Sequence, residues 1–240
     1  MAKRKTIDYS NPPETLDDHP FFGLQLDEEQ KAFRDAIWNP EKLIVLCDAK
    51  AGCGKTTIAV MTAELLVKYG RYDGIVYVTS PVQEQKIGFL PGTVQDKLSV
   101  YNEPFYQAAL KAGIDVLHAV KQESMLNVKE DTAYIDCVSH TFFRGQNIEN
   151  KVVIIDEAQN YYFDELKKTL TRIHDSCKTI VIGHTGQCDL YHRPEHSGFV
   201  DYLAEARYEP FASVCKLTHN YRGVVSNWAD SVEHEMERLL

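Results

Sequence analysis

A lysine and two threonines that follow a short glycine-containing stretch are the residues of this chain best suited to phosphate chemistry. The stretch reads Lys50-Ala51-Gly52-Cys53-Gly54-Lys55-Thr56-Thr57. Gly52 and Gly54 permit the backbone torsions and close approach that let successive N–H groups point at a phosphate chain. The ammonium group of Lys55 can neutralise the β- and γ-phosphates of a nucleotide. Thr56 offers a hydroxyl to Mg²⁺, which prefers oxygen ligands.

The flanking sequence gives this stretch the context of a P-loop. The apolar run 43–47 precedes it as a strand, and an apolar helical stripe follows it at Ile58, Met61, Leu65 and Leu66. The N-terminus of that helix adds free N–H groups and a positive dipole end, which favour an anion. We therefore predict a nucleotide-binding loop made of Ala51, Gly52, Cys53, Gly54, Lys55, Thr56 and Thr57. The alternative is a glycine-rich turn before an ordinary helix.

Two positions of the loop are unusual. Ala49 stands where the pattern G-x-x-x-x-G-K-[ST] begins with glycine, and we expect this small residue to be tolerated while slightly reshaping the loop entrance. Cys53 lies close to Lys55 and to a helix N-terminus, an environment that lowers the pKa of a thiol. The sequence therefore suggests that oxidation of Cys53 would block nucleotide binding.

Two adjacent carboxylates, Asp156 and Glu157, end the hydrophobic run 151–155. In a P-loop protein, Asp156 would hold Mg²⁺ through water and Glu157 would polarise the attacking water. A GTPase usually orients that water with Gln, and a small-molecule kinase needs no activated water. The pair therefore favours nucleotide hydrolysis, and the alternative is a solvated acidic turn.

Two further candidates rest on weaker signals. Gln187 follows the expected strand 178–183, where a sensor of the γ-phosphate would lie, although a surface loop explains it equally well. Arg222 is a candidate arginine finger, and the alternative is an ordinary surface cation.

The order of apolar runs predicts an α/β fold. Strands are expected at 43–47, 74–79, 132–139, 151–156, 178–183 and 212–217, alternating with helices, among them 164–173 and one near the C-terminus. This alternation implies a mostly parallel central sheet with helices on both faces, and such sheets bind ligands at the carboxyl ends of their strands. We expect residues 1–22 to form a flexible lead-in and 23–240 a single domain.

Composition sets the remaining bounds. The formal net charge of -9 argues against a basic surface overall but allows a local basic groove. The 6 cysteines include no C-x-x-C pair, which indicates reduced, cytosolic usage. No apolar run approaches the roughly 20 residues that a membrane span needs. We therefore expect a cytoplasmic protein with no membrane partner.

Several motifs together resemble the PhoH-like family, RecA-type ATPases related to superfamily-one helicases. The resemblance spans roughly residues 26–235 and rests on these segments: Gly52-Cys53-Gly54-Lys55-Thr56, Gly88-Phe89-Leu90-Pro91-Gly92, Phe143-Arg144-Gly145, Asp156-Glu157-Ala158-Gln159-Asn160, Leu170-Thr171-Arg172-Ile173 and Gln187-Cys188-Asp189-Leu190. It implies ATP and Mg²⁺ as cofactors. It also implies that Gln30 reads adenine, although Gln30 fits a capping box begun by Asp27 equally well. His184 departs from the family's G-D-x-x-Q, whereas Asn220-Tyr221-Arg222-Gly223 resembles a helicase motif and strengthens the case for Arg222.

The same resemblance implies RNA or single-stranded nucleic acid as a partner. Phe143 and Arg144 are the candidate contacts, since an aromatic ring and a cation suit base stacking and phosphate binding. The chain has room for one RecA-type domain, so an arginine finger would have to come from a neighbouring subunit, and we expect a homo-oligomer, a hexamer by resemblance. The alternative function is a nucleotide-dependent regulatory or binding module with slow ATPase and no nucleic-acid activity.

Overall fold

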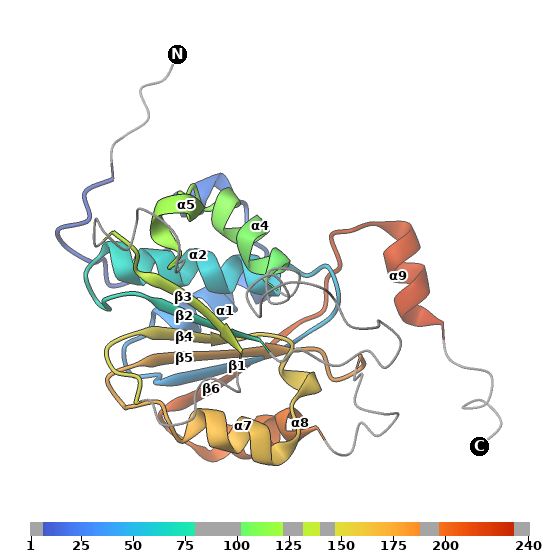
Figure 1. Cartoon of the computed structure of the whole chain (residues 1–240). Coiled ribbons are helices and arrows are strands. Elements are labelled where there is room, and N and C mark those ends of the chain that lie inside the picture. The colour runs from blue at the N-terminus through green and yellow to red at the C-terminus, as the bar shows by residue number, and fades with distance from the viewer. Residues whose placement is uncertain (1–6, 80–101, 122–131, 140–146, 188–196, 233–240) are drawn as a thin grey trace, which may run out of the picture.

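The central element of the computed structural model is a parallel β-sheet, shown in Figure 1. The structure describes residues 7–79, 102–121, 132–139, 147–187 and 197–232. Within these ranges the strands are β1 (Ile44–Ala49), β2 (Ile75–Thr79), β3 (Ile135–Ser139), β4 (Val152–Ile155), β5 (Lys178–Gly183) and β6 (Ala212–Leu217). Their order is β3-β2-β4-β5-β1-β6, and every pairing is parallel. The predicted fold class and the six expected strands are confirmed.

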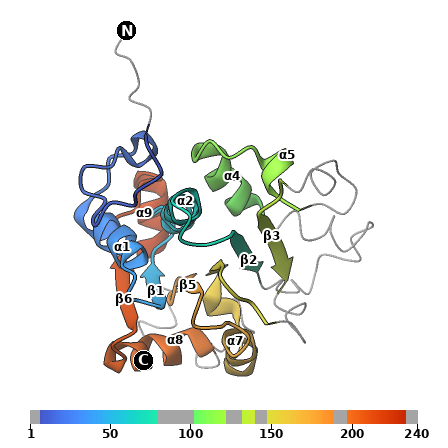
Figure 2. The same cartoon turned by 90° about the vertical axis from the view of Figure 1, so that its left-hand side faces the viewer.

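Helices cover both faces of the sheet, as Figures 1 and 2 show. One face carries α1 (Glu28–Trp38), α2 (Lys55–Lys68), α4 (Glu103–Lys111) and α5 (Val116–Ala119), and the other carries α7 (Phe163–Leu170) and α8 (Gly198–Glu205). The helix α9 (Val224–Ser231) follows β6 and projects from the sheet. Helix α8 was not predicted, because its eight residues follow a polar run that gives little sign of a helix.

The burial pattern of each element follows from its place in these layers. Helix α2 packs against the sheet, α1 and α4, so it is apolar on most of its surface, and residues Ile58–Leu66 are all buried. Strands β2, β4 and β5 are buried on both faces and read as continuous apolar runs. The core therefore lies in two layers, one on each side of the sheet.

Residues 7–22, which we expected to form a flexible lead-in, pack against the domain in the structure. Leu16 is fully buried, Phe21 is nearly so, and Tyr9 contacts Tyr69 with ring centroids 5.0 Å apart. The indole N–H of Trp38 donates a hydrogen bond to the Pro13 carbonyl at 3.1 Å. The sequence misled because its few apolar residues are spaced irregularly between prolines and acids. Residues 1–6 lie outside the described part of the chain.

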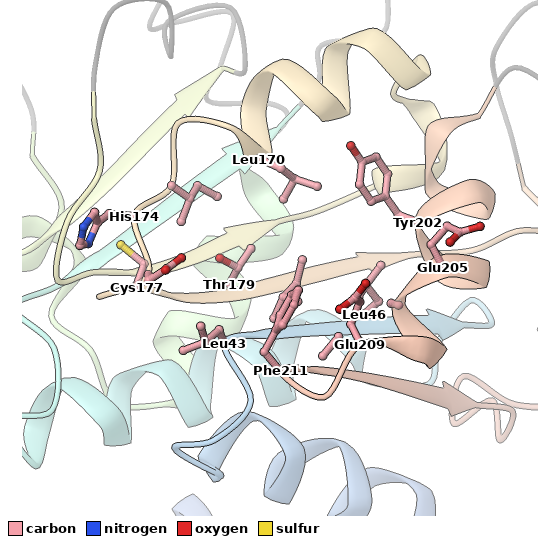
Figure 3. A pocket seen from close by; sticks show the side chains of 15 residues that line it. Leu43, Leu46, Leu170, His174, Cys177, Thr179, Tyr202, Glu205, Glu209 and Phe211 are labelled. Atoms are coloured by element: carbon pink, nitrogen blue, oxygen red, sulfur yellow. The ribbon is translucent and has the colours of Figure 1, made fainter.

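A cavity of ≈ 370 Å³ lies between α7 and α8 on the sheet face opposite α2 (Figure 3). Its lining is mostly apolar and includes Leu43, Leu46, Leu170 and Phe211. None of the described residues predicted to bind nucleotide or metal lines this cavity, so it is not the candidate functional site. Among the described helices, none is long and apolar enough to cross a membrane.

Candidate phosphate and metal site

The carboxyl ends of three neighbouring strands bring the predicted residues together. Strand β5 lies between β4 and β1, with Ile155 paired to Val181 and Asp48 paired to Gly183. The loop 50–54 follows β1, the acidic pair follows β4, and His184 follows β5. Ala49 is the last residue of β1, buried and paired with Leu217, so alanine at this position continues the strand without disturbing it.

The loop has the backbone of an anion cradle. Gly52 and Gly54 have φ angles of +74° and +81°, a region that favours glycine. A Cβ on Gly52 would also lie 2.8 Å from Cγ of Arg222, so the site has no space for a side chain there. Gly54 is the N-cap of α2 and supplies no side-chain hydrogen bond to the first turn.

The N-terminus of α1 has side-chain caps, which the N-terminus of α2 lacks. Asp27 and Gln30 form a complete capping box at the N-terminus of α1, so that its first N–H groups have side-chain partners. The first turn of the fourteen-residue helix α2 has no capping side chain and faces the cavity lined by Lys55, Thr56 and Thr57. Unpaired N–H groups at the positive end of a helix are suited to a phosphate.

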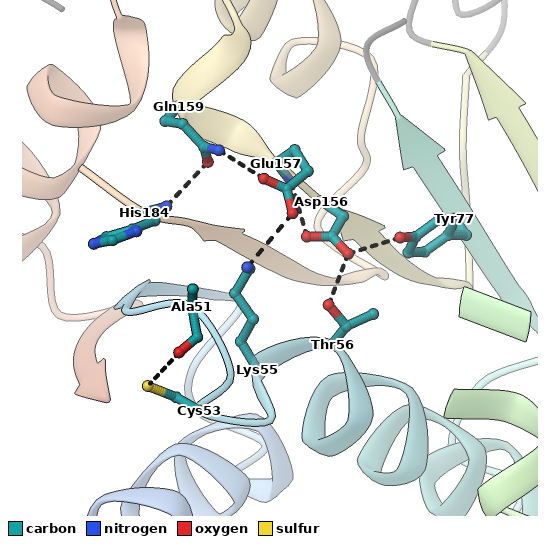
Figure 4. A network of polar contacts seen from close by, with 9 residues as sticks. All are labelled: Ala51, Cys53, Lys55, Thr56, Tyr77, Asp156, Glu157, Gln159 and His184. Atoms are coloured by element: carbon teal, nitrogen blue, oxygen red, sulfur yellow. Dashed lines mark hydrogen bonds and ion pairs between the residues drawn. The ribbon is translucent and has the colours of Figure 1, made fainter. Parts of the chain in front are cut away.

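The polar side chains converge in one network, drawn in Figure 4. The Thr56 hydroxyl donates to Oδ2 of Asp156 at 2.9 Å, and Nζ of Lys55 lies 3.4 Å from Oε1 of Glu157. Asp156 has no solvent exposure, whereas the Glu157 side chain is 44% exposed. The predicted pairing of the loop with the acidic pair is therefore present, and Asp156 is not part of a solvated turn.

The electrostatics of this network fit a hard cation. Burial, together with the negative charge of Glu157, raises the pKa of Asp156, and the ammonium group of Lys55 partly opposes that shift. A buried carboxylate beside a threonine hydroxyl offers the oxygen ligands that Mg²⁺ prefers. Within the described residues no cluster of three or more His, Cys, Asp or Glu side chains could hold a metal ion.

Gln159 connects Glu157 to the end of β5. Its side-chain N–H donates to Oε2 of Glu157 at 2.6 Å, and its Oε1 accepts the backbone N–H of His184 at 3.0 Å. Glu157 has a φ of +51°, an uncommon conformation for a residue with a side chain. The backbone turn and the Gln159 amide together orient the exposed carboxylate of Glu157 toward Lys55 (Figure 4).

A cavity of ≈ 630 Å³ opens beside the loop. Residues from the loop, from α4 and from the segment after β6 line it, among them Gly52, Lys55, Glu103, Tyr221 and Arg222. Gln30 also lines it, and its side-chain N–H donates to the Cys53 carbonyl at 3.0 Å. Both interpretations of Gln30 therefore remain compatible with its position, since it closes the capping box of α1 and faces the cavity.

The prediction for Cys53 needs correction. Its side chain is buried, and Sγ donates to the Leu217 carbonyl at 3.5 Å and to the Ala51 carbonyl at 3.9 Å. The thiol therefore packs beneath the loop against β6, where oxidants have little access. Because the tight turn directs the Cys53 side chain inward, Cys53 contributes its backbone and not its thiol to the loop.

The weaker candidates have different outcomes. Gln187 is exposed, and its backbone N–H donates to the His184 carbonyl at 3.1 Å. Arg222 lines the chain's own phosphate cavity and packs beside Gly52. Arg222 could therefore act within its own chain, and an arginine supplied by a neighbouring subunit stays a prediction. Phe143 and Arg144 lie outside the described residues.

Sequence reasoning missed three polar residues at this edge of the sheet. Tyr77 of β2 donates to Asp156, Gln159 holds Glu157, and Asp48 of β1 accepts hydrogen bonds from the backbone and hydroxyl of Thr185 at 3.0 to 3.1 Å. Tyr77 and Asp48 lie within strands that end at the site, and Gln159 lies in the short 3-10 helix Ala158–Asn160 that follows the acidic pair. Polar residues at or just beyond the ends of apolar strands were the sequence feature that could have identified them.

This fold and this site define a P-loop NTPase of the RecA-like α/β class. The chain belongs to the PhoH-like protein family, whose match covers residues 25–229. It is 32% identical to protein PhoH of Escherichia coli K12 over 169 residues, covering 70% of this chain and 45% of that protein. It is 27% identical to protein PhoH2 of Thermobispora bispora over 213 residues, covering 87% of this chain and 47% of that protein. The chain thus spans less than half the length of these relatives.

A solved structure supports the same fold. The large terminase of bacteriophage HK97 superposes with a TM-score of 0.52 at 10% identity, covering 84% of this chain and 41% of the terminase. At that identity the likeness concerns the fold alone. The predicted relation to PhoH-like proteins is confirmed.

Proposed function

We propose that this chain binds ATP with Mg²⁺ and hydrolyses it, and that hydrolysis is coupled to RNA or single-stranded nucleic acid. The observation that carries the proposal is the convergence of Lys55 and Thr56 from α2 with Asp156 and Glu157 from the end of β4, beside one open cavity. Each of these side chains has the chemical type and the neighbour that phosphoryl transfer to water requires.

Phosphate binding would use groups that are available at the loop. The N–H groups of the loop and of the first turn of α2 would contact the phosphate oxygens, as the absence of a capping side chain allows. Lys55 would exchange its ion pair with Glu157 for the phosphates, leaving the Glu157 carboxylate able to accept a proton. Arg222, at the wall of the same cavity, would stabilise the charge that develops on the γ-phosphate.

The metal would be held by Thr56 directly and by Asp156 through water. Mg²⁺ bound there supplies neutralisation of charge on the phosphate oxygens. Glu157, whose carboxylate is part-exposed and accepts a hydrogen bond from Gln159, would polarise the attacking water. Gln187 would sense the γ-phosphate only if its exposed side chain turns into the cavity when nucleotide binds.

Coupling to nucleic acid rests on the family and on exposed aromatic side chains. Tyr162 and Phe163, which follow the 3-10 helix Ala158–Asn160, are 39% and 43% exposed. The ammonium group of Lys167 lies 5.8 Å from the centre of the Phe163 ring. Rings and cations of this kind suit single strands. Phe143 and Arg144 remain candidate contacts, and a homo-oligomer, hexameric by resemblance, remains part of the proposal.

An ATPase assay with and without single-stranded RNA or DNA tests the proposal, with Lys55→Ala as the blank. We expect Mg²⁺-dependent phosphate release that the blank lacks and that one of the nucleic acids stimulates. Slow release from the wild type that neither nucleic acid changes would favour the alternative of a nucleotide-dependent binding module. Equal release from the wild type and the blank would refute the assigned site.

A further inference from the structure

Tyr77 is a core residue of β2 with a hydroxyl that reaches the candidate metal site. It is 1% exposed, and its ring packs on Phe105 of α4 with centroids 4.8 Å apart. Its neighbours in the strand, Val76 and Val78, are apolar and buried. Phenylalanine would fill the same space, so packing alone does not account for the hydroxyl.

The hydroxyl of Tyr77 donates to Oδ2 of Asp156 at 2.7 Å (Figure 4). The same oxygen accepts the Thr56 hydroxyl at 2.9 Å, and Oδ1 accepts the backbone N–H of Glu157 at 2.8 Å. The carboxylate is thus fixed from three elements: β2, α2 and its own backbone. A buried hydroxyl without a partner is costly, and Asp156 provides that partner.

Thr56 and Tyr77, the two side chains that donate to Oδ2 of Asp156, differ in whether they could also contact a metal. Thr56 lies at the start of α2, beside the cavity, and a lone pair of its hydroxyl oxygen can face a metal while the hydroxyl still donates its hydrogen bond to Asp156. Tyr77 is enclosed by the core and is not among the residues that line the cavity. A tyrosine hydroxyl carries its proton at neutral pH, so Tyr77 acts as a hydrogen-bond donor here.

We infer that Tyr77 is a positioning residue, which holds the Asp156 carboxylate in the orientation that binds the metal. This inference rests on the proposed nucleotide and Mg²⁺ site. Groups that orient metal ligands through hydrogen bonds typically change metal affinity by about 10- to 100-fold when they are removed. Through Phe105 the same residue also ties Asp156 to α4, whose first turn forms a wall of the cavity.

The test is the affinity for Mn²⁺, used as a spectroscopic substitute for Mg²⁺, in the presence of saturating ADP. Electron paramagnetic resonance would measure free Mn²⁺ with the wild type and with Tyr77→Phe. We expect Tyr77→Phe to weaken Mn²⁺ binding by about tenfold and to leave metal-free ADP binding unchanged. Equal Mn²⁺ affinity in the two proteins would overturn the inference. No ADP-dependent Mn²⁺ binding by the wild type would instead refute the proposed function.

Tyr134→Phe is the matched control. The Tyr134 hydroxyl donates to the buried Glu64 carboxylate at 2.9 and 3.1 Å, and neither residue lines the cavity. It removes a phenol–carboxylate hydrogen bond of the same kind, and we expect unchanged Mn²⁺ affinity. An equal loss in this control would mean that any such bond supports the site through overall stability, which would contradict a specific role of Tyr77.

A second measurement keeps the hydroxyl and does not depend on the folding of Tyr77→Phe. With 3-fluorotyrosine incorporated at position 77, the fluorine resonance should shift when Mg²⁺ is added to the ADP complex. The same label at position 134 should show no shift. An unchanged resonance at position 77, with Mg²⁺ shown to bind, would also overturn the inference.

Discussion

Two lysines lie at opposite ends of the strands, Lys55 beside the candidate site and Lys178 in the core, and their ammonium groups contact different kinds of partner. Lys55 lies at the carboxyl edge of the sheet, where the parallel strands end, and its side chain is 15% exposed. Its ammonium group lies 3.4 Å from Glu157, beside an open cavity. Lys178 begins β5 at the amino edge and is fully buried, and its ammonium group donates to the Lys42 carbonyl and, at 2.6 Å, to the Asn39 carbonyl. Lys55 can exchange its partner for a phosphate, whereas the partners of Lys178 are fixed backbone groups.

The same contrast extends to the surroundings of each lysine. The carboxyl edge carries an uncapped helix N-terminus and a buried carboxylate with a raised pKa, both of which a phosphate and a cation would satisfy. At the amino edge two basic side chains cap the end of α1, because Arg71 donates to the Trp38 carbonyl and Lys178 donates to the carbonyl of the C-cap residue Asn39. Substitutions at the first edge should therefore change activity, and substitutions at the second should change stability.

The largest expected effect is on hydrolysis in Glu157→Gln. Removing a positioned general base typically lowers the rate by about 10²- to 10⁴-fold. ATP affinity should be kept or increased, because the variant removes the carboxylate that competes for Lys55. Single-turnover hydrolysis and an ATP titration measure both. A rate within twofold of the wild type would show that Glu157 does not activate water.

Lys55→Ala should come next, with a loss of ATP affinity of about 10- to 150-fold, since a hydrogen bond to a charged group contributes about 1.5–3 kcal/mol. Thermal unfolding should change little, since Lys55 contributes one part-exposed ion pair. Titration with a fluorescent ATP analogue and calorimetry measure the two quantities. A strongly destabilised variant would contradict the expectation that substitutions at the carboxyl edge change activity and not stability.

Lys178→Met should change the pH dependence of stability and leave ATP binding unchanged. Burial, together with the charge of Arg71, lowers the pKa of Lys178 from 10.5 to about 7. Between these values the unfolded chain holds a proton that the folded chain has lost, so this group makes the free energy of unfolding rise with pH. One proton is worth about 1.36 kcal/mol per pH unit.

Denaturant unfolding of the wild type and Lys178→Met at pH 7 and pH 9 checks this prediction. The wild type should gain up to ~2.7 kcal/mol relative to the variant over these two pH units. Groups common to both proteins cancel in the comparison. A constant difference between the two proteins would mean that Lys178 keeps its proton across this range.

The smallest expected effect is from Arg71→Met. The Arg71 guanidinium donates to the Trp38 carbonyl at 2.9 Å and lies 4.8 Å from the centre of the Trp38 ring. Losing this hydrogen bond should cost about 1 kcal/mol of stability, with no change in nucleotide affinity. Calorimetry and an ATP titration measure the two. A clear loss of ATP affinity would show that the two edges are coupled.

Local sequence was sufficient for most of the fold and for the centre of the site. Apolar runs marked six strands, and the loop 50–57 with the acidic pair marked where they converge. What failed depended on contacts distant in sequence. The inward thiol of Cys53 and the reach of Tyr77 to Asp156 depend on contacts between residues 164 and 79 positions apart, and Leu16 is buried although the sequence around it has no regular apolar pattern. Periodicity does not report such contacts.

The most direct test of the central claim is hydrogen–deuterium exchange with and without Mg²⁺ and ADP. The account predicts slower exchange at the carboxyl edge, in peptides covering 51–58 and 155–160, and unchanged exchange at the amino edge, in peptides covering 39–43 and 174–178. Protection at the amino edge alone, or no protection while ADP is shown to bind, would contradict the assignment of the nucleotide to the loop and the acidic pair.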